Sequence, residues 1–226
     1  HRWRDSQSQE WPWFEASVTY ENARLCQALI QSGQWMPRDD ALQVGLTSLR
    51  WLVSIQKTQA GCFRPIGSNG FFEKEGARAE FDQQPVEAQA MVAACHEAFR
   101  ATQDPWWTKE ARRAFEWFLG RNDLGLALYD SATGGCHDGL HADRVNENQG
   151  AESSLAFHLS LAEMSRAEQL LGGFQAQPDE FDSAAATCHL DRASKPKGSS
   201  SAVHPGGNEP NPNHDGAGLC PLGGVS

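Results

Sequence analysis

Apolar residues recur at helical spacing in five segments, residues 14–32, 40–57, 85–101, 106–120 and 149–171. Such spacing places the apolar positions on one face of an α-helix, so we expect five helices. The third segment is Ala-rich and apolar on nearly all sides, which is typical of a helix that neighbours surround. The pattern therefore predicts an all-α fold with this helix in its interior.

The helical segments alternate in character, which indicates an internal repeat. Glu15, Glu87 and Glu152 stand near the starts of the first, third and fifth segments, each at the head of a similar short motif. Glycine-rich connections over residues 58–84 and 121–148 join successive units, and loops of this length usually have a function. We expect two complete helix hairpins and the first helix of a third.

Stacked helix hairpins form either an open solenoid or a closed ring. We favour a partial α/α toroid over residues 11–175, with Ala-rich helices inside, Trp-bearing helices outside, and the long loops gathered where the inner helices begin. Residues 1–10 are expected to be the N-terminal segment of a truncated chain, because His1 stands where Met would and no signal-peptide pattern follows. Residues 176–226 are expected to be a divergent, disordered tail, since their end is rich in Pro and Gly and lacks aromatic residues. Whether it is a linker or a frame-shifted end stays open.

The formal charge of −10, without a block of Lys and Arg, argues against a nucleic-acid-binding surface. No apolar run is long enough to span a bilayer. The six cysteines are far apart without a C-x-x-C pair, which indicates neither a disulfide framework nor a zinc site and favours a reducing cytoplasm. We expect Cys26 and Cys95 to be small buried hydrophobic residues.

No metal or other cofactor is expected. His137 and His141 lie four residues apart, but the context is a glycine-rich loop without a third ligand, so we expect solvated histidines. The chain has no G-x-x-x-x-G-K motif that would cradle the phosphates of a nucleotide.

Carboxylates at the helix starts are the candidate catalytic groups. Cleavage of a glycosidic bond needs one protonated carboxylic acid and one carboxylate that acts as base or nucleophile. Asp82 and Glu152 are the first candidates for these roles, and Glu87 and Glu15 would support them. For Glu87 and Glu152 the alternative is capping alone, because a glutamate in the first helical turn can bind an unpaired backbone amide.

For Asp82 the alternative is a turn or an ion pair with Arg64 or Arg78. Neutral hydrogen-bonding groups beside aromatic rings suit a polyhydroxylated ligand, because a sugar has both hydroxyl edges and apolar faces. The residues expected to bind such a substrate are Trp13, Arg64, Gln83, Gln84, Asp138, Asn148 and Gln149.

Six strings of the chain carry a family resemblance: Trp11–Glu15, Tyr20–Arg24, Gly61–Ser68, Phe81–Ala88, Trp117–Asp123 and Asn148–Ser153. They resemble the helical region C-terminal to bacterial group 1 glycosyltransferases, and the wider six-hairpin glycosidase superfamily. The resemblance covers residues 11–165, and after about residue 175 the chain departs from the family pattern. It implies a toroid attached to an upstream transferase module that uses sugar nucleotides.

The sequence thus predicts a carbohydrate-acting domain of a bacterial glycosyltransferase-like protein, with a carbohydrate substrate or acceptor and the upstream module as partners. One alternative is a non-catalytic arc that binds a glycan or positions an acceptor for the transferase. A second alternative is a truncated fragment without activity.

Overall fold

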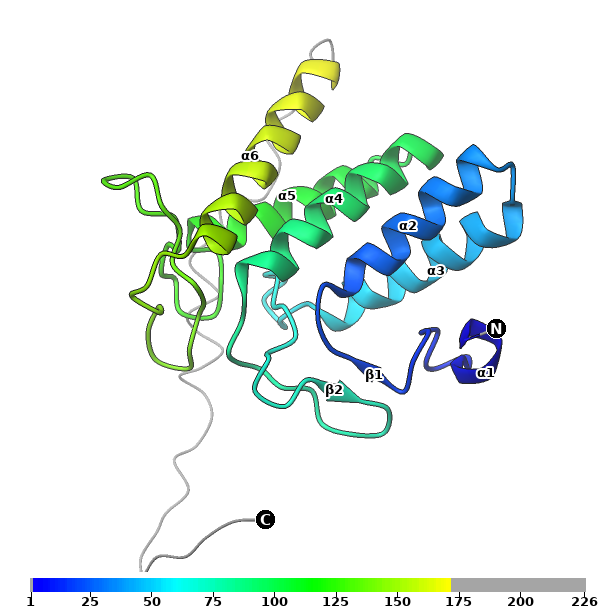
Figure 1. The fold of residues 1–226 in the computed structure, drawn as a ribbon, viewed down its shortest axis with the longest axis horizontal. Helices are drawn as coiled ribbons and strands as arrows, with labels where there is room; N and C mark the ends of the chain where they lie inside the picture. Colours follow the sequence, from blue (N-terminus) through cyan, green and yellow to red (C-terminus); the bar gives the residue numbers. More distant parts are fainter. Residues whose placement is uncertain (1, 172–226) are drawn as a thin grey trace, which may run out of the picture. The chain divides into compact units, whose positions relative to one another are not determined.

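The computed structural model describes residues 2–171, all within the first of two compact units, residues 1–195 (Figure 1). The predicted tail over residues 176–226 lies outside the described residues. The described chain is mostly helical, as the apolar spacing predicts, and it also contains a small two-stranded sheet that the sequence did not indicate.

Five longer helices correspond to the five predicted segments, and a short helix precedes them. Three further short elements were not predicted as such: two strands and a 3₁₀ helix that continues the fifth helix. The helices are α1 (Arg2–Ser6), α2 (Asn22–Trp35), α3 (Asp39–Ile55), α4 (Pro85–Thr102), α5 (Trp106–Glu116) and α6 (Ala151–Leu171), the 3₁₀ helix is η1 (Trp117–Leu119), and the strands are β1 (Ser17–Val18) and β2 (Phe72–Glu73).

The longer helices form two layers. Helices α2, α4 and α6 lie side by side with α4 in the middle, while α3 packs on α2 and α5 packs on α4 (Figure 1). The helices α2, α4 and α6 all begin at the end where the long loops lie (Figure 1). The two predicted hairpins, α2–α3 and α4–α5, are therefore present, with their first helices in one layer and the returning helices in the other.

Helix α4 lies at the centre of the core. Every side chain from residue 85 to residue 98 is buried, and many of them are alanines. Small side chains let α2, α5 and α6 approach the α4 backbone closely, which is why an Ala-rich helix suits this place. Pro85 occupies the first turn, where its missing N–H is not needed. The prediction of an interior helix is confirmed.

Residues 14–21 are not helical, so the predicted start of the first helix is wrong. Ser17 pairs with Glu73 and Val18 with Phe72 in the antiparallel sheet, a long-range contact that helical spacing cannot reveal. Glu21 then takes a left-handed conformation with φ of 45° directly before α2. Val18 is therefore buried through an extended segment instead of a helix face, while Tyr20 stays exposed.

Cys26, Cys95 and Cys136 are buried free thiols, as expected for Cys26 and Cys95. Cys62 is disulfide-bonded, which the sequence analysis did not expect. None of the described helices is long and apolar enough to cross a membrane.

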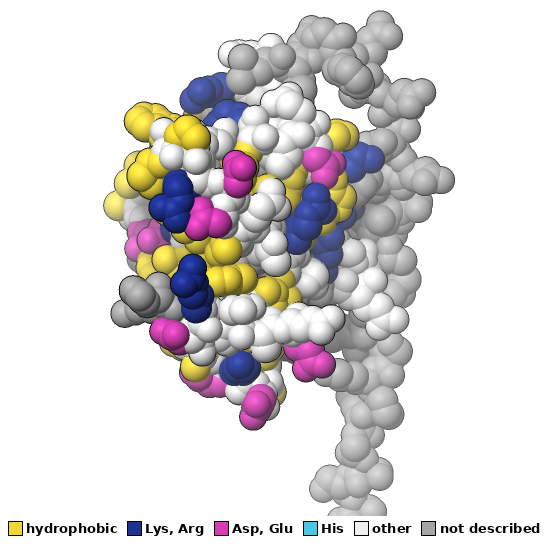
Figure 2. Space-filling model, turned by 90° about the vertical axis from the view of Figure 1, so that its right-hand side faces the viewer, with side chains coloured by type: hydrophobic (Ala, Val, Ile, Leu, Met, Phe, Trp, Pro, Cys, Tyr) yellow, Lys and Arg dark blue, Asp and Glu magenta, His cyan; other side chains and the backbone are white. Residues whose placement is uncertain are grey.

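The turn between α2 and α3 lies at the end of the helices that is remote from the long loops. It carries two exposed apolar side chains, Trp35 at 88% exposure and Met36 at 61%. Figure 2 views the molecule from this side and shows apolar side chains lying among Lys, Arg, Asp and Glu.

Candidate functional site

The candidate site is the loop-bearing end, which we define as the first turns of α2, α4 and α6 together with residues 58–84 and 121–150. The two loops meet here, because the Gln83 and Leu140 backbones exchange hydrogen bonds of 3.0 and 2.8 Å in an antiparallel bridge. Both complete connections of the repeat therefore border the starts of the same three helices (Figure 1).

Glu87, in the first turn of α4, caps the neighbouring helix α2. Its carboxylate accepts hydrogen bonds from the Glu21 backbone N–H and, at 3.1 Å, from the Asn22 side-chain amide. The residue is only 4% exposed, and this burial raises the pKa of Glu87 to about 7 against the hydrogen bonds that lower it. The expected capping role is thus present, but it serves α2 rather than Glu87's own helix.

Glu152, in the first turn of α6, is exposed and accepts a 3.1 Å hydrogen bond from the Tyr20 hydroxyl. Burial and then the hydrogen bond and charge of Glu152 raise the pKa of Tyr20 to about 12. This contact joins the segment that leads into α2 with the start of α6. Both side chains remain open to solvent, since Tyr20 is 48% exposed.

Glu15 does not lie at a helix start. It precedes β1, is half-buried, and its backbone carbonyl accepts a 2.8 Å hydrogen bond from the Trp11 indole N–H. The prediction that three glutamates head three helices therefore holds for Glu87 and Glu152 and is wrong for Glu15.

Asp82 pairs with His141 from the other long loop. The antiparallel Gln83–Leu140 bridge makes Asp82 and His141 neighbours across the two loops, and His141 Nδ1 contacts Asp82 Oδ1. Neither residue is fully buried, with side-chain exposures of 42% for Asp82 and 28% for His141. The expectations of an ion pair from Asp82 to Arg64 or Arg78 and of a solvated His141 are both wrong.

Close packing of the first long loop holds Asp82 in place. The Ser68 N–H donates a 3.0 Å hydrogen bond to the Asp82 carbonyl, and the Ser68 hydroxyl contacts the same carbonyl at 3.3 Å. A Cβ added at Gly67 would lie 1.8 Å from the Phe81 carbonyl oxygen, so this crossing requires glycine. The Gln84 side chain, part-buried, donates to the Ser68 hydroxyl at 3.3 Å.

Arg64 and Gln83 belong to a buried network that fixes the loops to η1. Arg64 Nε and Gln83 Nε2 donate to the two oxygens of Asp123 at 2.8 and 2.7 Å, and Trp117 Nε1 donates to Gln83 Oε1 at 2.8 Å. Gln83 has no exposed surface. The structure therefore places Gln83 beneath the site, where no ligand reaches it.

Asp138 caps α6 with a carboxylate from the loop. Its Oδ1 accepts hydrogen bonds of 2.7 Å from both the Gly150 N–H and the Ser153 hydroxyl, and Oδ2 accepts from the Asn148 amide. Burial acts to raise the pKa of Asp138, but these hydrogen bonds outweigh it and hold the pKa below its ordinary value. Asp138 thus takes the capping place at α6 and leaves Asn148 exposed beside it.

The remaining predicted binding residues have structural contacts. Trp13 is only 1% exposed, and its indole N–H donates to the Ser17 carbonyl at 3.0 Å, so it belongs to the core and offers no platform for a sugar. Gln149 bonds Thr133 at 2.8 Å and Asp130 at 3.1 Å, which ties the tip of the second loop to the start of α6. His137 is likewise engaged, with Nδ1 2.8 Å from the Asn146 carbonyl oxygen.

Sequence reasoning missed Tyr20, and it set His141 aside as solvated. Both side chains are positioned by partners that are distant in the sequence, Glu152 for Tyr20 and Asp82 for His141. No local pattern signals such pairs. Within residues 2–171 no group of three or more His, Cys, Asp and Glu side chains could hold a metal ion.

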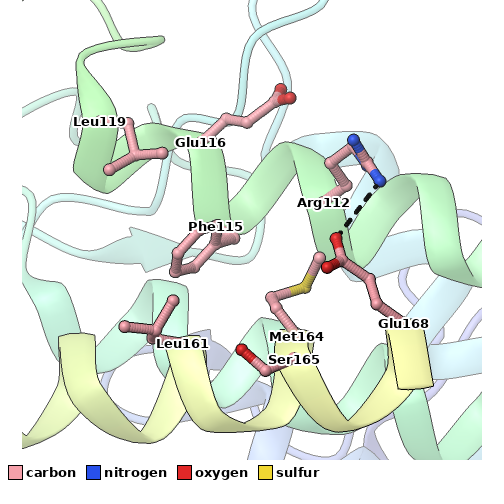
Figure 3. A pocket seen from close by; sticks show the side chains of 8 residues that line it. All are labelled: Arg112, Phe115, Glu116, Leu119, Leu161, Met164, Ser165 and Glu168. Carbon is pink, nitrogen blue, oxygen red and sulfur yellow. Dashed lines mark ion pairs between the residues drawn. The ribbon is translucent and has the colours of Figure 1, made fainter. Parts of the chain in front are cut away.

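A separate groove lies between α5 and α6, near the far end of α6 (Figure 3). Its cavity volume is about 190 Å³, and Phe115, Leu119, Leu161 and Met164 provide its apolar lining. The Arg112–Glu168 ion pair of 3.7 Å closes one side (Figure 3). Arg112, Glu116, Ser165 and Glu168 provide its polar lining, and none of the residues predicted as catalytic or substrate-binding lies in it.

No protein-family model matches the chain, and no curated protein matches it.

Proposed function

We propose that the loop-bearing end is the site of a carbohydrate-acting domain from a bacterial glycosyltransferase-like protein. The observation that carries the proposal is the Tyr20–Glu152 contact, which joins the entry of the first hairpin to the start of the third across α4. It presents an aromatic ring, a phenol and a carboxylate to solvent at the end where both long loops lie.

The chemistry at this end suits a sugar. The face of Tyr20 can pack against the apolar face of a pyranose ring. The partly exposed polar side chains of Ser68, Gln84 and Asn148 can exchange hydrogen bonds with hydroxyl groups. Glu152 and the Asp82–His141 pair are then the groups available for proton transfer at a glycosidic bond.

The resemblance supplies the rest of the proposal. A row of helices that all begin at one end, each followed by a returning helix in a second layer, is compatible with part of an α/α toroid. An upstream transferase module that uses sugar nucleotides would then be the partner.

A glycan-binding arc without catalysis is the second candidate. The Glu87 and Asp138 carboxylates favour this candidate, because both act as helix caps. Their oxygens accept hydrogen bonds from the protein itself and are therefore not available for catalysis. Such an arc would hold an acceptor for the transferase, and the glycosidic bond would be formed in the transferase module.

A glycan array probed with the chain tests the proposal. Bound glycans are then incubated with the protein, and the products are separated by chromatography. We expect Glu152→Gln and Asp82→Asn to lose binding or turnover. The control is Glu168→Gln, which replaces an exposed glutamate at the far end of α6 and should leave binding and turnover at the wild-type level. Unchanged binding and turnover in folded Glu152→Gln and Asp82→Asn would remove both residues from the site. Binding without any product favours the arc.

A further inference from the structure

The Asp82–His141 contact determines which nitrogen of the His141 ring carries the proton. Asp82 Oδ1 meets His141 Nδ1, and a carboxylate at that nitrogen accepts a hydrogen bond from it. The proton of a neutral imidazole then resides on Nδ1, and the lone pair is left on Nε2. Orientation of an imidazole by a carboxylate is the arrangement in which histidine serves as a general base.

The second ring nitrogen is open to a ligand. Across residues 2–171, the structure gives Nε2 of His141 no hydrogen-bond partner, and the side chain is 28% exposed. The backbone that carries the ring is also fixed, because the His141 backbone N–H donates to the Arg144 carbonyl at 2.9 Å and Leu140 is bridged to Gln83. The ring is therefore anchored through Nδ1 on an ordered backbone, while Nε2 makes no hydrogen bond to the described residues.

We propose that His141 is a general base of the loop-bearing end and that Asp82 is its positioning residue, a role that rests on the proposed carbohydrate function. The substrate group is a hydroxyl, either of water or of a carbohydrate. This assignment changes the part of Asp82, which orients the base instead of taking the proton itself.

The proton balance of the step uses His141 and water. The O–H bond of the attacking hydroxyl breaks, its proton moves to His141 Nε2, and the electrons left on oxygen form the new bond to the anomeric carbon. The bond from that carbon to the leaving oxygen breaks, and this oxygen takes a proton from water. The imidazolium returns its proton to the solvent, so that no net proton is gained or lost by the protein.

Long-range ¹H–¹⁵N NMR of the histidine rings in the full chain tests the assignment. Spectra are compared for wild type and Asp82→Ala at about pH 8, where an ordinary imidazole is neutral, and His141→Gln identifies the His141 signals. We expect the proton on Nδ1 in wild type and a shift of the proton toward Nε2 in Asp82→Ala. The matched control is Asp143→Ala, an exposed carboxylate of the same loop that pairs with Arg144 and should leave the tautomer unchanged.

A second arm adds the glycans that the array identifies as bound. A glycan that shifts the Nε2 resonance of wild type supports the proposal, and free sugar or a lengthened saccharide among the products distinguishes water from a carbohydrate hydroxyl. A proton on Nε2 in wild type overturns the assignment of His141, whatever the glycans do. The expected tautomer without a response to any glycan overturns the carbohydrate role, and with it the proposed function, while orientation by Asp82 stands.

Discussion

The first turns of α4 and α6 begin with similar motifs, yet their glutamates have different surroundings. Glu87 is 4% exposed, and its carboxylate accepts hydrogen bonds from the Glu21 N–H and the Asn22 amide. Glu152 is exposed, and its carboxylate accepts a hydrogen bond from the Tyr20 hydroxyl. The difference comes from position in the row, because α4 has neighbours on both sides, α2 and α6.

The same sequence signature thus places one glutamate inside the fold and leaves the other exposed to solvent. Replacement of Glu87 should therefore act on stability, and replacement of Glu152 should act on binding.

Glu87→Ala has the largest expected effect. The substitution leaves the Glu21 N–H and the buried Asn22 amide without an acceptor, which costs about 3 kcal/mol of the free energy of unfolding. Urea denaturation measures it, with Glu152→Ala as the matched control. Equal losses in the two variants would end the distinction between the two glutamates.

The pH dependence of the free energy of unfolding also tests whether the Glu87 carboxyl is buried. Because burial raises the pKa of Glu87 from 4.5 to about 7, the folded chain holds the proton more tightly than the unfolded chain. The contribution of Glu87 is complete below pH 4.5 and is lost as the pH rises through 7. The free energy of unfolding should fall over this interval in wild type more steeply than in Glu87→Gln. Parallel curves from urea titrations at several pH values would contradict the burial of an ionisable carboxyl here.

Asp138→Ala should have an intermediate effect. The variant removes the acceptor of the Gly150 N–H and the Ser153 hydroxyl at the start of α6, and loss of such a cap costs about 1 kcal/mol. Because the pKa of Asp138 is lowered, this stability is present at neutral pH and is lost as the pH falls through the folded pKa. Urea denaturation and hydrogen exchange of the first α6 amides measure it. Unchanged exchange in that turn would show that another group caps the helix.

Glu152→Gln should have the smallest effect on stability, less than about 0.5 kcal/mol, because the side chain is exposed. It should lower the pKa of Tyr20 from about 12 toward 10, since the charge of Glu152 is removed while the larger cause, burial, remains. NMR of ¹³C-labelled tyrosine follows the ionisation, and Glu168→Gln is the control. An unchanged pKa of Tyr20 would show that the Tyr20–Glu152 contact is absent in solution.

The helices were predictable wherever local pattern and packing agree. Segment 85–101 matches α4 and segment 40–57 matches α3 closely, because an amphipathic or Ala-rich period reports directly on which face is buried. The prediction failed before α2, where residues 17–18 pair with residues 72–73 instead of continuing a helix. Strand pairing over that sequence distance leaves no local signal in so short a strand.

The positions of two candidate glutamates were predictable, but their contacts were not. The repeat correctly put Glu87 and Glu152 in the first turns of α4 and α6, beside the long loops. It could not show that Glu87 caps α2, or that the register of the Gln83–Leu140 bridge brings Asp82 to His141. Such pairs depend on how distant loops meet, which the fold decides.

Titration calorimetry of Glu152→Gln with a glycan that binds the wild type tests the central claim most directly, with urea denaturation of the same sample. We predict that Glu152→Gln loses the binding heat while its free energy of unfolding stays at the wild-type value. Wild-type affinity in the folded variant would contradict the assignment of the loop-bearing end as the carbohydrate site.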